Sequence, residues 1–200
     1  MKKSYLILIG IAVVVLIIFS WVKGTYNGMV NEQEKATTAL ANVQSAYQRR
    51  ADLIPNLVEV VKKYAAHEQE TLEGVVKARA EATSINLKVD DLTPEKMQAF
   101  QAAQAKLHNE FQGALSRLIA VSESYPDLKA NENFRDLQVQ LEGSENRINE
   151  ARNSYNGAVQ KYNVTVRSFP ANIFAGMFGF EKMDKFEAEA GAEKAPQVKF

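Results

Sequence analysis

An uninterrupted apolar run near the N-terminus constrains this chain more than any other feature. It covers residues 5–22, reads YLILIGIAVVVLIIFSWV and carries no charged residue. At ~1.5 Å per residue in a helix, about 18 residues extend roughly 27 Å, close to the thickness of a bilayer core. Tyr5 and Trp21 lie at the two ends of the run, where aromatic side chains favour the membrane interface. We therefore predict a transmembrane anchor over residues 5–22.

Two other interpretations of this run fit the sequence less well. A cleaved signal peptide has a shorter apolar core followed by a cleavage site with small residues. Here the end of the run reads SWVKG over residues 20–24, and the chain has no cysteine that could carry a lipid. A buried core helix is also disfavoured, because a helix that is apolar on all sides belongs in lipid or in a large interior. The sequence therefore favours an anchor that is retained.

Charges on the two sides of the run give the anchor a direction. Lys2 and Lys3 lie in a short basic N-terminus, residues 1–4, whereas Lys23 on the other side is followed by mixed acidic and basic residues. Basic residues favour the cytoplasmic side of a membrane. We therefore expect a single-pass protein of the cytoplasmic (inner) membrane, with the part that follows the anchor on the extracytoplasmic side.

The composition leaves little material for catalysis. The 24 basic and 24 acidic residues cancel and are interspersed, so no basic stripe could follow nucleic-acid phosphates. The chain has two histidines and no cysteine. Di-iron bundles need a Glu-x-x-His motif on two helices, but Tyr64 and Ala105 lie three residues before His67 and His108. We predict no enzymatic activity, no cofactor, no metal, no small-molecule substrate and no nucleic-acid partner.

Apolar residues recur at alternating steps of three and four over most of the remaining chain, which predicts long helices. This spacing forms the seam of helices that pack lengthwise, as in a bundle or coiled coil. No strand pattern of comparable length interrupts it. The first segment has Ala36, Leu40, Val43, Tyr47, Arg50, Ile54, Leu57, Val61 and Tyr64 at its seam positions. The second has Met97, Phe100, Gln104, Leu107, Phe111, Ala114, Leu118, Val121 and Tyr125, where Gln104 fills the one polar position of that seam. The third has Phe134, Leu137, Leu141, Ser144, Ile148, Ala151, Tyr155, Ala158, Tyr162, Thr165 and Phe169.

Prolines and capping residues mark the helix boundaries. The sequence TPE at 93–95 provides a cap, a proline at the first helical position and an acid near the positive end of the helix. Pro126 disfavours helix at the residue before it, and Asn131 can cap the next helix. The short turn between them predicts antiparallel neighbours. Pro170 ends the last long helix.

Pro55 lies where the first seam would otherwise continue. A proline inside a helix removes one hydrogen bond and clashes with the preceding turn, at a cost of ~3 kcal/mol. A break near residues 51–54 gives four helices of comparable length that can all bury their seams. The favoured fold is therefore all-α, with an N-terminal transmembrane helix, an exit linker over residues 23–28 and an antiparallel up-and-down four-helix bundle over residues 29–180. The alternative has three long helices, the first of them kinked at Pro55.

Two segments lie outside these seams. Residues 170–180 read PANIFAGMFGF, which is apolar but too short to span a membrane. They either cap the end of the bundle or contact a membrane surface or a partner. Residues 181–200 are polar and rich in Ala, Glu and Lys, so we predict a disordered tail.

The last long helix carries a polar series on the face away from its seam. Asn is a poor residue for a helix interior, and an ordinary solvated face would use Glu, Lys and Arg instead. The series is either a polar outer face or a hydrogen-bonding surface for a partner, to which Arg147 and Arg152 would add positive charge. It consists of Asn146, Asn149, Asn153, Asn156, Gln160 and Asn163.

Two charged residues, Arg50 and Glu68, fall at or near seam positions. Charged groups at such positions either extend to the edge of the bundle or pair inside it. We favour exposed side chains at the edges over an interior polar link that fixes the helix register.

Three longer strings resemble a known family. They are RRADLIPNLVEVVKKYAAHE at 49–68, SESYPDLKANENF at 122–134, and EGSENRINEARNSYNGAVQKYN at 142–163 with SFP at 168–170. In this order and spacing they closely resemble the LemA family. The resemblance implies a single-pass bacterial membrane protein with a four-helix bundle and no established enzymatic activity. It also makes the following residues candidates for a contact surface: Arg49, Asp52, Asn56, His67 and Glu68.

These observations together predict a membrane-anchored, non-enzymatic scaffold or adaptor for membrane or envelope proteins. The alternative is a self-associating protein that organises the membrane, with a lipid-contacting segment at 170–180. The expected partners are the lipid bilayer, a membrane or envelope protein and a second copy of the chain. Tyr5 and Trp21 are the predicted membrane-interface residues. The predicted interaction surface comprises Arg49, Asp52, Asn56, His67, Glu68, Asn146, Asn149, Arg152, Asn153 and Asn156.

Overall fold

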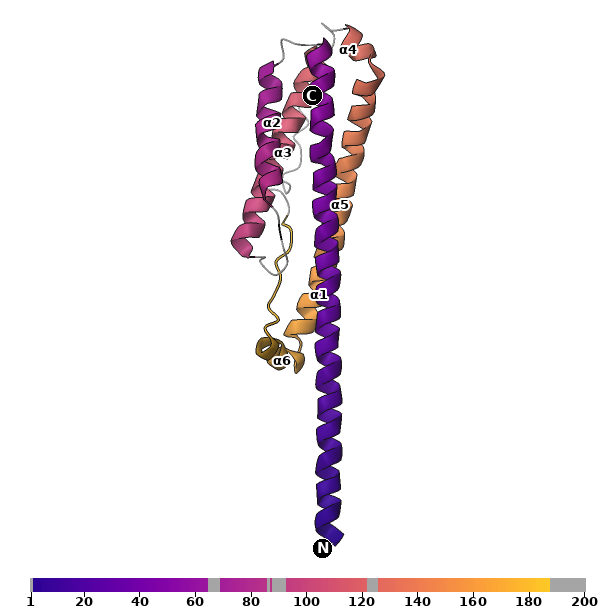
Figure 1. The fold of residues 1–200 in the computed structure, drawn as a ribbon, viewed down its shortest axis with the longest axis vertical. Helices are drawn as coiled ribbons and strands as arrows, with labels where there is room; N and C mark the ends of the chain where they lie inside the picture. The colour runs from indigo at the N-terminus through magenta and orange to yellow at the C-terminus, as the bar shows by residue number, and fades with distance from the viewer. Residues whose placement is uncertain (1, 65–68, 86, 88–92, 122–125, 188–200) are drawn as a thin grey trace, which may run out of the picture. The chain divides into compact units, whose positions relative to one another are not determined.

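The described part of the chain is built from α-helices and their connections, which confirms the predicted all-α class. The computed structural model describes residues 2–64, 69–85, 87, 93–121 and 126–187, and no strand occurs within them (Figure 1). The helices are α1 (Lys2–Tyr64), α2 (Gln69–Ser84), α3 (Pro94–Val121), α4 (Pro126–Ala130), α5 (Glu132–Arg167) and α6 (Ala171–Phe178).

The chain divides into two compact units. The stem unit comprises Met1–Ala39 and Ser154–Lys185, and the bundle unit comprises Leu40–Asn153 and Phe186–Phe200. Both α1 and α5 therefore contribute residues to each unit. This division differs from the single bundle predicted over residues 29–180, because residues 29–39 and 154–180 belong to the stem unit.

The bundle unit is a four-helix bundle in which α1, α2, α3 and α5 alternate in direction, as predicted (Figure 1). The seam residues of these helices meet in one hydrophobic core, and complete burial of a Leu or Val side chain contributes ~1.5–3 kcal/mol. Leu128 of the short helix α4 is fully buried in the same core. The core is formed by Ala51, Leu53, Ile54, Leu57, Val61, Leu72, Val75, Ala78, Ala82, Leu107, Phe111, Ala114, Leu118, Leu128, Phe134, Leu137 and Leu141.

The predicted break near residues 51–54 is wrong. Helix α1 continues through Pro55 to Tyr64, and α2 begins at Gln69. The boundary between the first two helices of the bundle therefore lies between Tyr64 and Gln69. Residues 23–28, predicted as a linker, are also helical and belong to α1. The bundle therefore has the predicted number of helices with a different boundary between the first two.

A contact from α2 explains how α1 continues through Pro55. Proline has no N–H, so the carbonyl of Ala51, four residues earlier, has no donor in its own helix. The Arg79 side chain supplies one, since its Nε donates to the Ala51 oxygen at 2.9 Å. The Pro55 ring itself is exposed and displaces no core residue. A tertiary hydrogen bond thus replaces the one that Pro55 removes.

The predicted starts of α3 and α5 are confirmed by their capping contacts. The backbone N–H of Lys96 donates to the Thr93 hydroxyl at 3.3 Å. The backbone N–H of Phe134 donates to the Asn131 side-chain oxygen at 3.0 Å. Each contact satisfies one of the N–H groups that the first turn of a helix leaves without a partner.

In the stem unit, α6 packs on α1 and α5. Ala175 of α6 is buried with Met29, Tyr162 and Val166. The helix ends at Gly179, whose φ of 77° is in the left-handed region that glycine adopts readily. The segment 170–180 is therefore folded against α1 and α5 within the stem unit, and both expectations for it, a cap on the bundle and a membrane or partner contact, stay predictions.

The apolar run at the start of α1 is exposed along its whole length. Its large side chains, from Tyr5 to Trp21, are 42–69% exposed. Within the described residues, α1 is the one helix that is long and apolar enough to cross a membrane. None of the residues 5–22 of the predicted anchor is buried within the described protein.

We predict that Arg79→Met destabilises the bundle by ~1–2 kcal/mol, because the substitution leaves the buried Ala51 carbonyl without a donor. In a Pro55→Ala background the backbone N–H of residue 55 restores the helical bond, so Arg79→Met should then cost far less. Urea unfolding of the detergent-solubilised chain, followed by circular dichroism, measures both costs as a double-mutant cycle. Lys77→Met, at an exposed position of α2, is the control for lost charge. Equal costs in the two backgrounds would contradict the explanation.

Candidate interaction surface

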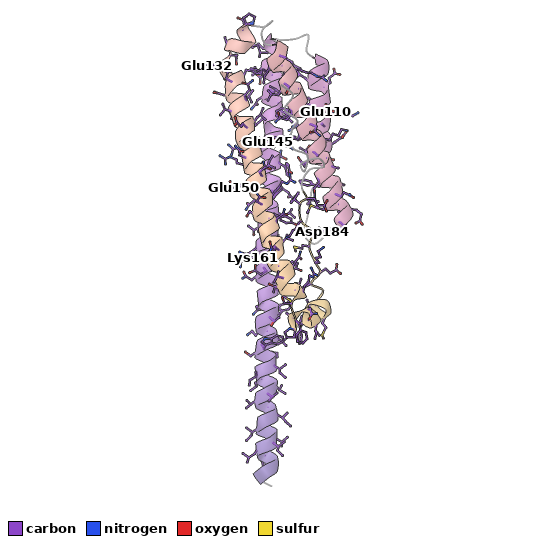
Figure 2. All side chains as sticks on the ribbon, turned by 180° about the vertical axis from the view of Figure 1, so that it is seen from behind. Glu110, Glu132, Glu145, Glu150, Lys161 and Asp184 are labelled. Carbon is purple, nitrogen blue, oxygen red and sulfur yellow. The ribbon has the colours of Figure 1, made fainter. Side chains whose placement is uncertain are left out.

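The predicted polar series on α5 divides into an exposed part and a buried part. In the bundle unit, Ile148 is buried, and the helical period therefore turns the neighbouring amides outward. Asn146, Asn149 and Asn153 are exposed, on the stretch of α5 that carries the labelled Glu150 in Figure 2. The predicted outward orientation of these three side chains is confirmed, and their role in binding a partner stays a prediction.

Asn163, by contrast, is buried and holds the chain's own C-terminal segment. Its side-chain amide donates to the Met183 carbonyl at 2.8 Å, and its side-chain oxygen accepts from the Met183 backbone N–H at 2.9 Å. This two-point contact satisfies both polar groups of one backbone residue. The prediction that Asn163 lies on the outer face is therefore wrong.

Two tyrosines of α5 reinforce this attachment within the stem unit. Tyr162 donates its hydroxyl to the Glu181 carbonyl at 2.8 Å, and Tyr155 donates to the Asp184 carbonyl at 3.0 Å. Burial raises the pKa of the Tyr155 hydroxyl, and the nearby Asp184 carboxylate raises it further, so the hydroxyl remains a donor at neutral pH. The sequence identified both tyrosines as seam residues but gave no sign that their hydroxyls bind backbone.

Residues 186 and 187 are held in the bundle unit. Arg152 donates to the Glu187 carbonyl at 2.6 Å, and its guanidinium lies 5.6 Å from the centre of the Phe186 ring. Phe186 is 4% exposed and meets Phe100 edge to face. The prediction of a disordered tail is thus wrong for residues 181–187, while residues 188–200 lie outside the described part of the chain. Arg152, predicted as a surface residue, contacts the chain itself.

A buried polar layer crosses the core of the bundle unit at Arg50, which is 2% exposed. One terminal nitrogen of Arg50 donates to the Glu145 carboxylate at 3.1 Å, and the other donates to both the backbone and side-chain oxygens of Gln104, each at 3.1 Å. Gln104 in turn donates to the Ala82 carbonyl at 3.3 Å. The layer therefore joins all four long helices. The expectation of an edge-exposed Arg50 is wrong, and the interior polar link is confirmed for this residue.

The acidic member of this layer is stabilised in its charged form. Burial acts to raise the pKa of Glu145, but the hydrogen bond with His108 and the charge of Arg50 outweigh it and hold the pKa below its ordinary value. His108 Nδ1 lies 3.3 Å from the Glu145 carboxylate and 3.4 Å from Arg50. Each charged group faces an opposite charge or a hydrogen-bond partner, so the layer is suited to fixing helix register. The sequence gave no sign of Glu145, because its partners lie on other helices.

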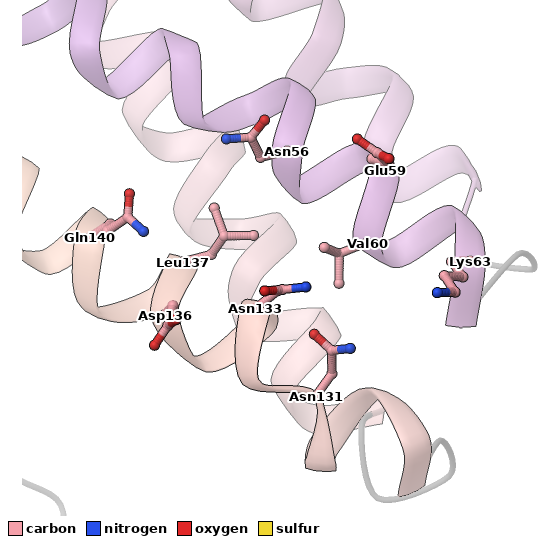
Figure 3. Close-up of a pocket in the computed structure, with 9 residues that line it drawn as sticks. All are labelled: Asn56, Glu59, Val60, Lys63, Asn131, Asn133, Asp136, Leu137 and Gln140. Carbon is pink, nitrogen blue, oxygen red and sulfur yellow. The ribbon is translucent and has the colours of Figure 1, made fainter.

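A polar groove of about 370 Å³ lies between α1 and the start of α5 in the bundle unit (Figure 3). Its lining contains four amide side chains and three charged ones, and Val60 and Leu137 are its apolar members. Small-molecule sites are mostly apolar, whereas rows of amides suit hydrogen bonding to polypeptide. The groove is lined by Asn56, Glu59, Val60, Lys63, Asn131, Asn133, Asp136, Leu137 and Gln140.

The predicted contact residues of α1 have different surroundings. Asn56 lies in this groove, and Arg49 is exposed. Asp52 accepts a hydrogen bond from Gln48 at 2.8 Å and lies 3.9 Å from Arg79, so it helps to hold the Arg79 side chain beside Ala51. His67 and Glu68 lie outside the described residues. Among the residues that the structure describes, no group of three His, Cys, Asp or Glu side chains is arranged to hold a metal ion.

The LemA family model matches residues 39–200 of this chain. The chain belongs to the LemA family. Protein LemA of Metamycoplasma hominis is 23% identical over 188 residues, which cover 94% of this chain and 80% of that protein.

Magnetosome proteins are also among the relatives of this LemA-family chain. Magnetosome protein MamQ of Magnetospirillum gryphiswaldense is 26% identical over 189 residues, which cover 86% of this chain and 70% of that protein. Magnetosome protein MamQ 2 of Paramagnetospirillum magneticum is 25% identical over 181 residues, which cover 84% of this chain. The chain spans 66% of the length of this MamQ protein.

Several residues in the LemA-like strings have roles inside the fold. Arg50 joins helices in the buried layer, Asn131 caps α5, and Asn163 holds the C-terminal segment. Among the residues of these strings, Asn146, Asn149 and Asn153 are exposed on α5, and Asn56 lies in the polar groove. These two regions form the candidate interaction surface.

We predict that Glu145→Gln destabilises the protein by ~1–2 kcal/mol at pH 7, because it removes the charge that faces the buried Arg50. The carboxylate contributes fully above its ordinary pKa of 4.5, and its contribution is lost as the pH falls through the lowered folded value. The difference between variant and wild type should therefore shrink below that pH. Unfolding midpoints in urea across the acid range measure this difference.

Glu142→Gln, at an exposed position of the same helix, is the matched control and should have little effect at any pH. A loss of stability in Glu145→Gln that stays constant from neutral to acid pH would contradict the assigned role of its charge.

Proposed function

We propose that this LemA-family protein is a membrane-anchored, non-enzymatic scaffold or adaptor that presents its bundle to membrane or envelope proteins. The main observation behind the proposal is that two different segments belong to the single helix α1. One helix contains both the exposed apolar run and a seam of the bundle core. A chain built in this way attaches a protein-binding module to a bilayer.

The exposure of the apolar run supports the anchor. Soluble proteins rarely expose contiguous apolar surface larger than a few hundred Å², and burying each large aliphatic side chain is worth ~1.5–3 kcal/mol. The side chains from Tyr5 to Trp21 are all available for such burial. Together they favour insertion into lipid strongly. The lysines before the run favour the inner membrane with the bundle on its extracytoplasmic side.

The use of the buried polar groups supports a non-enzymatic role. Arg50, Glu145 and Gln104 are engaged with one another and with backbone in the bundle core. Catalytic groups must instead face a space that a substrate can enter. A layer whose members pair with one another stabilises one arrangement of the helices, which is what a presenting scaffold requires.

The candidate interaction surface indicates the kind of partner. Its amides donate and accept hydrogen bonds without a strong charge preference, so it suits the polar surface or backbone of another protein. Arg147, exposed beside Asn146, adds one cation and favours acidic groups on that partner. Self-association, the alternative predicted from the sequence, stays a prediction.

We predict that a protein partner is captured with the wild-type chain and lost when Asn146, Asn149 and Asn153 are each replaced by Lys. Each substitution replaces an amide by a larger, charged side chain. The proposed interface therefore loses its amide hydrogen-bond donors and acceptors. Gentle cross-linking in cells, followed by purification from detergent-solubilised membranes and quantitative mass spectrometry, measures the recovery.

The matched control is the triple substitution of Gln98, Ala102 and Asn109 by Lys, which adds the same number of lysines at exposed positions of α3. The control should retain the partner. Equal recovery of every co-purifying protein from the two triple variants would count against the α5 surface, and the absence of any stoichiometric partner would count against the scaffold itself.

A further inference from the structure

The stem unit has a second exposed apolar region besides the run at the start of α1. Ile173 and Met177 lie one turn apart on one face of α6 and are 53% and 73% exposed. Phe169, just before the helix, is 81% exposed, and Phe178 at its end is 47% exposed. Residues 168–180 contain no charged side chain. This stretch therefore has an apolar surface that the described protein leaves uncovered.

An adjacent side of α6 is attached to α1 at the end of the apolar run. The Phe174 ring meets Trp21 edge to face with ring centres 5.5 Å apart, and Phe178 meets Tyr26 in the same way at 5.1 Å. Ala175 is buried in the cluster that contains Met29. These contacts place α6 beside the part of α1 that begins at the last residues of the run.

Trp21 indicates what covers the exposed face of α6. Tryptophan at the end of a membrane span lies at the level of the lipid headgroups. A helix attached to Trp21 therefore lies at the same depth, where one face meets protein and the other meets lipid. Trp21 belongs to the apolar run and contacts Phe174 of α6, so a bilayer that covers the run also reaches this helix.

We propose that α6 is an interfacial helix, with Phe169, Ile173 and Met177 inserted into the same leaflet that α1 leaves at Trp21. The inference rests on the proposed membrane anchor. A single span can turn about its own axis in a bilayer, whereas a second contact to one side of it restricts that rotation. Charged residues on both sides of the uncharged stretch, Arg167 and Lys182, suit the headgroup region.

The depth of α6 can be measured in the full-length chain, because the protein has no cysteine of its own. Single-cysteine variants are labelled with bimane and reconstituted into vesicles of phosphatidylcholine and phosphatidylglycerol. Lipids brominated either near the headgroups or near the chain ends quench the label according to depth. Met177→Cys reports on α6, Val13→Cys on the span, and Asn149→Cys on the exposed bundle surface. Circular dichroism checks that each variant is folded.

The expected result is several-fold stronger quenching at Met177 than at Asn149, with Met177 favouring the shallow bromines and Val13 the deep ones. Quenching at Val13 alone would overturn the interfacial helix while leaving the anchor intact. Quenching at neither position would overturn the anchor and the inference together. A Met177 label that is shielded from water, insensitive to brominated lipid and dependent on protein density would overturn the inference in favour of a second copy of the chain.

Discussion

The hydrogen bond from Arg79 to the Ala51 carbonyl is the contact on which the arrangement of the bundle depends. It replaces the bond that Pro55 removes from α1 and so lets this helix continue to Tyr64. Because α1 continues, Leu57 and Val61 extend its seam into the core shared with α2, α3 and α5. A helix that ended before Pro55 would divide the same residues between two shorter helices. The Arg79 guanidinium and the burial of this seam therefore both favour a first helix that continues through Pro55.

Most of the distinctive polar residues are used inside the fold. The Arg50 layer joins the long helices of the bundle unit, and the side chains of Tyr155, Tyr162 and Asn163 hold residues 181–184 in the stem unit. Both devices give hydrogen-bond partners to polar groups that are costly to bury, although the Nε of Arg50 is buried without one. The exposed amides on α5 and the polar groove beside Asn56 lie outside both devices and form the candidate interaction surface.

Periodicity predicted the all-α class and a bundle of four helices, and capping chemistry predicted the starts of α3 and α5, because these signals come from residues close together in sequence. The continuation through Pro55 could not be predicted in this way, since Arg79 comes from another helix. The roles of Glu145 and Asn163 could not be predicted for the same reason, since their partners are distant in sequence. Glu145 pairs with Arg50 of another helix, and the Asn163 side chain binds the backbone of Met183. Of the candidate surface, the exposure of Asn146, Asn149 and Asn153 followed from the helical period. The groove, which needs two helices side by side, did not.

The central claim is that α1 crosses a bilayer and leaves the bundle outside the cytoplasm. Labelling of Lys3→Cys and Asn149→Cys with a membrane-impermeant maleimide, in spheroplasts before and after permeabilisation, tests it most directly. The account predicts that Asn149→Cys reacts before permeabilisation and Lys3→Cys only afterwards. Reaction of both positions under the same condition would contradict a membrane-crossing α1. The reverse order would contradict the extracytoplasmic bundle.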